Sequence, residues 1–132
     1  MSELEVITPS KAAYKGKVKS VTVPGTQGNF QILENHAPII SSLEIGVIKI
    51  VEEDGKSLVF ATSGGTVEVV ENKITVLAET FESKDEIDAK RAEEAKRRAE
   101  ERLAKRKIEK IDSLRAELAL KRAINRLKIL ND

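Results

Sequence analysis

The sequence predicts a β-sandwich of short antiparallel strands over residues 1–82, followed by a C-terminal α-helical hairpin over residues 83–132. Three observations support this division. All seven glycines and all three prolines lie in the first segment. Apolar residues alternate along that segment, whereas in the second they recur at spacings of three and four. A change of period from two to about 3.6, with the loss of every glycine and proline, indicates a change of secondary-structure class.

Charge changes sign at the same boundary. Residues 1–82 contain 7 lysines, no arginine and 11 acidic residues, which gives a net charge of −4. Residues 83–132 contain 8 lysines, 8 arginines and 11 acidic residues, which gives +5. The net charge of +1 for the whole chain therefore conceals an acidic domain joined to a basic one.

Composition excludes several classes of site. The chain has no cysteine, so disulfides and thiolate metal sites are excluded, and His36 is its single histidine, so no histidine pair can hold a metal. No stretch is apolar over the roughly 20 residues that a membrane span needs. The first residues, MSELEVITPS, resemble neither a signal peptide nor a transit peptide. We expect no direct membrane insertion.

The strands of the first domain are predicted from short β-branched runs, each with one buried face. The alternating apolar pairs are Leu4 and Val6, Val21 and Val23, Ile48 and Ile50, Leu58 and Phe60, Val67 and Val69, and Ile74 and Val76. Turn signals separate these runs at Pro24-Gly25, Asp54-Gly55 and residues 71–73. Because no helical stretch lies between the strands, a βαβ fold is excluded and two packed sheets are expected.

Two features of this domain have a functional and a structural interpretation. His36 could titrate near neutral pH, but a lone histidine before Ala-Pro at the end of a strand is better interpreted as a turn residue that bonds nearby backbone. Gly64-Gly65 could cradle a phosphate, but no helix or lysine follows it, so we interpret it as a β-bulge or a turn.

The second domain begins with Ser83-Lys84-Asp85-Glu86, a capping-box sequence that predicts a helix starting near Lys84. A narrow apolar stripe made mostly of alanine follows, at Ala92, Ala95, Ala99 and Leu103. A wider apolar face is predicted farther on, at Ile111, Leu114, Leu118, Leu120, Ala123, Ile124, Leu127 and Leu130. Ion pairs at i, i+4 are expected at Glu86-Lys90, Glu93-Arg97, Glu94-Arg98, Glu101-Lys105 and Glu117-Lys121.

Two shapes of this segment are open. Neither glycine nor proline interrupts it, so one continuous helix is allowed, about 69 Å long at 1.5 Å per residue. A hairpin with its turn in the polar stretch at residues 105–110 would be about half as long. Both shapes satisfy the pattern.

Three phrases of the sequence resemble the epsilon subunits of bacterial F-type ATP synthases. These are residues 28–38, which end in Asn35-His36-Ala37-Pro38, the hairpin phrase at residues 63–69, and the last strand at residues 74–79. The family usually has glycine at the position of Gln31. The resemblance implies a non-catalytic rotor subunit that contacts the gamma subunit and the c-ring, peripheral to the cytoplasmic face of the plasma membrane. It also implies that the helices extend toward the alpha and beta subunits and inhibit ATP hydrolysis.

The resemblance extends to ATP-binding members of that family. Residues 87–92, Ile-Asp-Ala-Lys-Arg-Ala, fit the I/L-D-x-x-R-A motif at the start of the first tail helix, and residues 120–127 resemble the second-helix phrase. The resemblance implies ATP as a regulatory ligand and not as a substrate, since the sequence has no Walker-type loop. The implied ATP-binding residues are Glu82, Ile87, Asp88, Arg91, Ala92, Arg98, Arg122 and Arg126. Magnesium is not specified by the sequence.

The arginines suit this role because guanidinium groups make forked, charge-assisted bonds to phosphate. In an antiparallel hairpin we expect Arg91, Arg98, Arg122 and Arg126 to converge. The resemblance implies that they contact the phosphates or stack on the base, and that Glu82 and Asp88 accept from adenine or ribose groups. Alternatively, these arginines are solvated side chains tied to neighbouring acids. Residues 111–116 match the same motif, so the motif alone is weakly specific.

Two other functions fit parts of the sequence. A structural rotor adaptor without ATP sensing would have the same fold. A nucleic-acid-binding protein would use the basic tail, but four aromatic residues, no tryptophan and 11 interleaved acids argue against nucleic acid as a partner.

Overall fold

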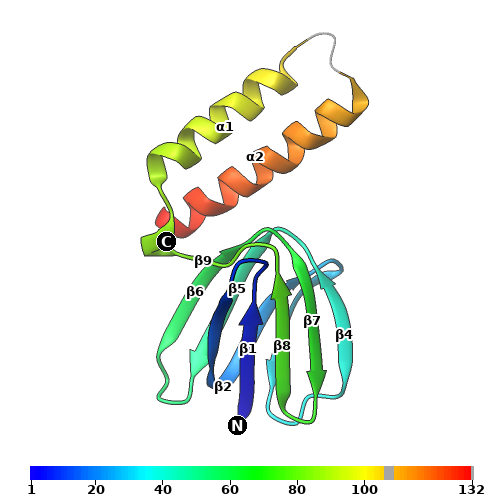
Figure 1. Cartoon of the computed structure of the whole chain (residues 1–132), viewed down its shortest axis with the longest axis vertical. Coiled ribbons are helices and arrows are strands. Elements are labelled where there is room, and N and C mark those ends of the chain that lie inside the picture. Colours follow the sequence, from blue (N-terminus) through cyan, green and yellow to red (C-terminus); the bar gives the residue numbers. More distant parts are fainter. Residues whose placement is uncertain (106–108, 132) are drawn as a thin grey trace. The chain divides into compact units, whose positions relative to one another are not determined.

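The computed structural model describes residues 1–105 and 109–131. They form two compact units, Met1–Ser83 and Lys84–Asp132. The first unit is all-β and the second contains two α-helices (Figure 1). The predicted fold class, a β-sandwich followed by a helical pair, is therefore confirmed. No helix within the described ranges is long and apolar enough to cross a membrane.

Nine strands build the first unit. In chain order they are β1 (Ser2–Ile7), β2 (Ala12–Gly25), β3 (Gly28–Leu33), β4 (Ile39–Leu43), β5 (Gly46–Glu52), β6 (Ser57–Thr62), β7 (Gly65–Val70), β8 (Lys73–Ala78) and β9 (Glu82–Ser83). They pair in the order β1-β8-β7-β4-β2-β5-β6-β9, with β3 also on β2 and β1 also on β2. Strands adjacent in sequence that pair do so antiparallel, whereas β1 and β8 are parallel.

The long strand β2 belongs to both layers of the sandwich. Its first half pairs with β1, and its second half pairs with β3 and β5. The register against β5 shifts between Val18 and Ser20, and directly after this shift the buried positions change from Val18 and Ser20 to Val21 and Val23. A bulge bends and twists a strand, so this irregularity lets β2 pass from one layer to the other.

The core is made by the residues that the alternation selects. Five of the six predicted pairs are almost fully buried, and each such Val, Leu or Ile contributes about 1.5–3 kcal/mol. The exception is Leu58 and Phe60, which are half-buried at the edge of the core. Phe60 stacks on Phe81, with ring centroids 4.0 Å apart. This contact holds the last segment of the unit against β6, where β9 then pairs.

The three predicted turns have different outcomes. Asp54-Gly55 lies in the β5–β6 hairpin as predicted, with Gly55 at φ +92°. Glu71 and Asn72 make the two-residue β7–β8 turn, both at positive φ, as a primed hairpin turn requires. The turn predicted at Pro24-Gly25 is wrong. Both residues are the end of β2, and the chain reverses after them so that Gly25 pairs with Gly28.

His36 and Gly64-Gly65, which each had a functional and a structural interpretation, both have structural roles. Asn35 has φ +63°, the His36 backbone N–H donates to Leu33 O, and His36 Nδ1 lies 2.7 Å from Ala37 O, so the turn interpretation is confirmed. Gly64-Gly65 is not a hairpin turn, because β6 and β7 pair with other strands. The two glycines carry the chain between them at φ +119° and +146°.

Gly65 is the position where a side chain is least tolerated. A Cβ there would lie 1.9 Å from Leu77 O, whereas a Cβ at Gly55 would meet nothing within 4 Å. We predict that Gly65→Ala destabilises the sandwich by roughly 2–5 kcal/mol and Gly55→Ala by roughly 1–2 kcal/mol. Urea unfolding followed by tyrosine fluorescence measures this, since Tyr14 is the chain's one tyrosine and lies in this unit. Equal losses in the two variants would contradict the steric argument.

Tyr14 gives the sandwich a pH dependence. Its hydroxyl donates to Glu52 Oε2 at 2.7 Å. Burial, followed by the bond to Glu52 and the charges of Glu52 and Asp54, raises the pKa of Tyr14 well above its ordinary value of 10.0. The folded state therefore holds this proton more tightly than the unfolded state does. The resulting stabilisation is complete below pH 10 and is lost as the pH rises beyond it.

We therefore predict that absorbance at 295 nm shows no tyrosinate at pH 10 in the folded chain and half-ionisation in urea. Tyr14→Phe lacks the bond to Glu52 and should lower stability at pH 7 by about 1 kcal/mol. Above pH 10 the Tyr14→Phe variant should lose stability less steeply than the unaltered chain. Lysines titrate in the same range in both proteins, so their contribution cancels when the two are compared. A midpoint near 10 in the folded chain would contradict the burial argument.

Candidate functional site

The predicted ATP-binding residues fall mainly in the helical unit. It consists of a short 3₁₀ turn, η1 (Lys84–Glu86), and the helices α1 (Ala89–Leu103) and α2 (Lys110–Asn131). The two helices contact each other and run antiparallel (Figure 1). The structure thus has the hairpin and not the continuous helix. The predicted turn at residues 105–110 falls largely on residues 106–108, which lie outside the described residues.

The helical unit begins where the capping-box sequence predicted a helix, near Lys84. Residues 84–86 form a 3₁₀ turn, and the α-helix α1 begins at Ala89. Asp88 is the N-cap, with extended backbone, and its Oδ1 accepts from the Arg91 backbone N–H at 3.1 Å. Short polar side chains favour this position because they satisfy an exposed helix donor. Asp88 therefore already has a structural role.

The helices pack through small side chains. Ala92 and Ala99 of α1 and Ala116 and Ala123 of α2 are at most 4% exposed. Ala95 and Ala119 are half-buried. We call these six residues the alanine seam. The stripe predicted for α1 is confirmed, whereas three residues of the wide face predicted for α2 are exposed by 46–65%: Ile111, Leu114 and Ile124.

The register of the two helices is indicated by a hollow between them. The hollow is lined by Ala95 and Ala99 of α1, by Ala116 and Ala119 of α2, and by the arginines Arg98 and Arg102. Counting from the hollow along the two antiparallel helices, Ala92 of α1 comes level with Ala123 of α2. Arg91 then lies level with a point on α2 between Arg122 and Arg126.

The predicted ATP-binding residues are thus distributed as follows. Arg91, Arg122 and Arg126 share one level of the hairpin, while Arg98 lies about 10 Å farther along α1 at 1.5 Å per residue. Ile87 is buried at the start of the helical unit, and Ala92 belongs to the alanine seam. Glu82 is a residue of β9 in the first unit, where it pairs with Ala61.

The ion pairs formed around these arginines differ from those predicted. Among the described residues from 93 to 121, none of the expected i, i+4 ion pairs forms; Arg97 instead lies 3.8 Å from Glu101, with the acid second. Exposed pairs contribute little, because water and side-chain entropy compete with them. The guanidinium groups of Arg91, Arg98 and Arg122 therefore have no ion-pair partner among the described residues and are available to a ligand.

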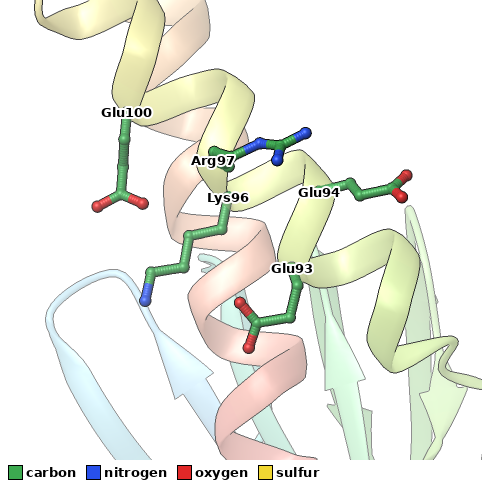
Figure 2. Close-up of a pocket in the computed structure, with 5 residues that line it drawn as sticks. All are labelled: Glu93, Glu94, Lys96, Arg97 and Glu100. Carbon is green, nitrogen blue, oxygen red and sulfur yellow. The ribbon is translucent and has the colours of Figure 1, made fainter.

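A second hollow lies on the other flank of α1. Its lining residues all come from this helix and project from it as Figure 2 shows: Glu93, Glu94, Lys96, Arg97 and Glu100. Three carboxylates outweigh two cations, which disfavours phosphate. None of these residues is a predicted ATP ligand. Among the residues that the structure describes, no group of three or more His, Cys, Asp or Glu side chains is placed to hold a metal.

The two copies of the six-residue motif differ in their surroundings. In the first, Ile87 is buried and Asp88 caps α1. In the second, Ile111 is 65% exposed and Asp112 lies in the first turn of α2. The copies therefore occupy different helix positions, although their sequences match.

Comparison with known proteins identifies the family. Residues 1–84 match the family described as "ATP synthase, Delta/Epsilon chain, beta-sandwich domain", and residues 85–131 match "ATP synthase, Delta/Epsilon chain, long alpha-helix domain". The chain belongs to the ATP synthase delta/epsilon family. The predicted resemblance to epsilon subunits is therefore confirmed.

Relatives of this delta/epsilon chain are named ATP synthase epsilon chain. The protein of Desulfitobacterium hafniense is 50% identical over 124 residues, covering 94% of this chain and 92% of the relative. That of Exiguobacterium sp. is 44% identical over 126 residues, covering 96% and 93%. That of Pelotomaculum thermopropionicum is 52% identical over 103 residues, covering 78% and 76%.

Two solved structures have the same fold. A chain of the Euglena gracilis mitochondrial ATP synthase OSCP/F1/c-ring structure superposes with a TM-score of 0.85 at 19% identity, covering 96% of this chain and 79% of that one. A chain of the Tetrahymena thermophila mitochondrial ATP synthase central stalk/c-ring structure gives 0.71 at 18% identity, covering 98% and 96%. At these identities the likeness shows the fold alone.

The capping role of Asp88 leads to a prediction. Asp88→Ala should destabilise the helical unit by about 1 kcal/mol, while Asp88→Asn should leave it nearly unchanged, because asparagine caps as well as aspartate. Thermal unfolding followed by circular dichroism at 222 nm measures both. Asp85→Ala, in the 3₁₀ turn, is the matched control. A loss in Asp88→Asn equal to that in Asp88→Ala would show that the carboxylate charge, and not the cap, is what matters.

Proposed function

We propose that this chain is the epsilon subunit of a bacterial F-type ATP synthase, a non-catalytic central-stalk subunit that couples the catalytic head to the c-ring. Membership of the delta/epsilon family, over both the sandwich and the helices, supports this proposal. So do the two structural neighbours, which come from ATP synthase structures that contain a central stalk or a c-ring. In this role the chain contacts the gamma subunit and the c-ring and is peripheral to the cytoplasmic face of the plasma membrane.

The helical unit acts as the regulatory element in this proposal. When extended, its helices reach the alpha and beta subunits and block ATP hydrolysis; when folded as the hairpin, they do not. The alanine seam supports the switch, because small side chains bury little surface and leave the hairpin easily opened. The structure contains the folded state.

ATP holds the hairpin folded. This step is supported by the register inferred from the hollow, in which Arg91, Arg122 and Arg126 fall at one level of the hairpin, with guanidinium groups from both helices. An anion held by both helices binds only the folded state. At a hundredfold excess over Kd, such a ligand stabilises that state by about 2.7 kcal/mol, enough to decide a near-balanced equilibrium.

The roles proposed for the site residues are those that the family resemblance implies. Arg91, Arg98, Arg122 and Arg126 contact the phosphates or stack on the base, and Glu82 and Asp88 accept from adenine or ribose, with Ile87 and Ala92 lining the site. Asp88 can cap α1 through one oxygen and use the other for the ligand, because a carboxylate accepts more than one bond.

Calorimetry on the whole chain tests ATP binding. We predict that Arg122→Ala and Arg126→Ala each weaken ATP binding about 10- to 100-fold, since a bond to a charged group contributes roughly 1.5–3 kcal/mol. Arg97→Ala, on the other flank of α1, is the matched control and should bind ATP normally. No heat of binding in the unaltered chain, or undiminished affinity in the two variants, would refute the sensing role.

The regulatory role has a separate test in the assembled synthase. Removing residues 84–132 should leave the complex assembled and raise its rate of ATP hydrolysis. If hydrolysis is unchanged and only coupling weakens, the chain is a structural adaptor whose helices serve as packing.

A further inference from the structure

The two helices of the hairpin are copies of one sequence. Residues 87–103, IDAKRAEEAKRRAEERL, align without a gap on residues 111–127, IDSLRAELALKRAINRL. Ten of the 17 positions are identical. The repeat thus extends well beyond the six-residue motif. It matches the arginines Arg91, Arg98 and Arg102 of α1 with Arg115, Arg122 and Arg126 of α2.

The packing follows the repeat. The alanines buried in α1, Ala92 and Ala99, correspond to those buried in α2, Ala116 and Ala123. Equivalent residues of two antiparallel helices that contact through equivalent positions are related by a two-fold axis perpendicular to both helices. In the register inferred from the hollow, this axis passes near Ala95 and its counterpart Ala119.

The repeat also places all six arginines on one face of the hairpin. On α1, Arg91, Arg98 and Arg102 share a flank with Ala95, because residues three, four and seven apart lie on the same side of a helix. The same spacing puts the arginines of α2 on the flank of Ala119. Since Ala95 and Ala119 line the same hollow, the two flanks meet on one face.

On this face the arginines form two clusters of three. The first contains Arg91 between Arg122 and Arg126, at the proposed ATP level. The second contains Arg115, level with a point between Arg98 and Arg102. The two-fold axis exchanges the clusters, and their centres lie about 13 Å apart along the helices. The proposed function uses only Arg98 of the second cluster.

The hollow lies at the second cluster. Two of its six lining residues are Arg98 and Arg102, the other four belong to the alanine seam, and none is acidic. Arg115 is one helical turn from Ala119 on the same flank. Arg98, Arg102 and Arg115 are exposed and have no ion-pair partner within the described part of the chain. Of the nearby acids, Glu93, Glu94 and Glu100 line the second hollow, on the other flank of α1 (Figure 2). Asp112 lies three residues before Arg115 in the first turn of α2.

We infer that Arg98, Arg102 and Arg115 form a second anion site, which binds a small inorganic phosphate anion in the hollow between the helices. Three guanidinium groups over an apolar floor provide forked, charge-assisted donors for phosphate oxygens. The hollow measures about 120 Å³. Pockets for drug-sized ligands measure about 300–1,000 Å³, so the size of the hollow favours phosphate or pyrophosphate over a whole nucleotide.

Titration of the whole chain with sodium pyrophosphate at constant ionic strength tests this inference, with the arginine Nε–Hε signals followed by NMR. The signals of Arg102 and Arg115 should shift and saturate, while that of Arg97 should not move. Arg102→Ala/Arg115→Ala should weaken pyrophosphate binding at least tenfold. Equal shifts at Arg97, or undiminished binding in the double variant, would overturn the second site, because either result describes a diffuse ionic effect.

Two controls separate this site from the proposed ATP site. Arg97→Ala should bind pyrophosphate like the unaltered chain, and circular dichroism should confirm that every variant is folded. The Arg122→Ala/Arg126→Ala variant lacks the two arginines that α2 contributes to the first cluster. Its Arg102 and Arg115 signals should still shift and saturate with pyrophosphate. If the Arg102 and Arg115 shifts are lost in this variant, the second site is not independent of the first and the inference is overturned. Failure of ATP binding with intact pyrophosphate binding would refute only the proposed function.

Discussion

The close approach of two helices through alanine is the constraint on which the functional site depends. Each alanine methyl contributes about 0.8 kcal/mol on burial, whereas each Val, Ile or Leu of the sandwich core contributes about 1.5–3 kcal/mol. The seam therefore brings the backbones near each other without holding them strongly. One consequence is that arginines from both helices meet on one face. The other is that, in the proposed function, the binding energy of a single anion suffices to decide whether the hairpin stays folded.

The sequence predicts the fold class of the sandwich but not the course of every strand and turn within it. Period-two alternation selects the core because burial of one face is what defines a strand in a two-layer fold. Alternation within one strand does not reveal a bulge, so the passage of β2 between layers at Lys19 could not be predicted. The composition of Pro24-Gly25 predicts a turn, yet the turn follows these residues, because proline is tolerated at the end of a strand whose ladder is ending.

In the helices, the burial of the small residues was predicted correctly, whereas that of several large apolar residues was not. Ala92 and Ala99 are buried as the spacing indicated, but Ile111, Leu114 and Ile124 are exposed, because only the flank facing α1 is covered within the hairpin. The capping-box sequence coincides with the 3₁₀ turn at Lys84–Glu86, whereas α1 begins three residues later with Asp88 as its N-cap. The repeat of residues 87–103 is present in the sequence, but a six-residue comparison shows only its beginning. Its meaning needs the antiparallel register, which sequence alone leaves open.

Two anion sites on one hairpin would be coupled through its folding. Each uses guanidinium groups from both helices, so opening the hairpin destroys both sites together. By linkage, a ligand at either cluster raises the population that binds at the other, and the effect is reciprocal. Repulsion between the two anions opposes this, and so does competition for Arg98, which both sites use. The repulsion acts across about 13 Å of exposed surface, beyond the roughly 8 Å over which physiological salt screens charge, and the other five arginines are not shared. Folding therefore dominates, and pyrophosphate should tighten ATP binding by the factor by which ATP tightens pyrophosphate binding. A competition in which each ligand expels the other would instead mean that the six arginines serve a single site.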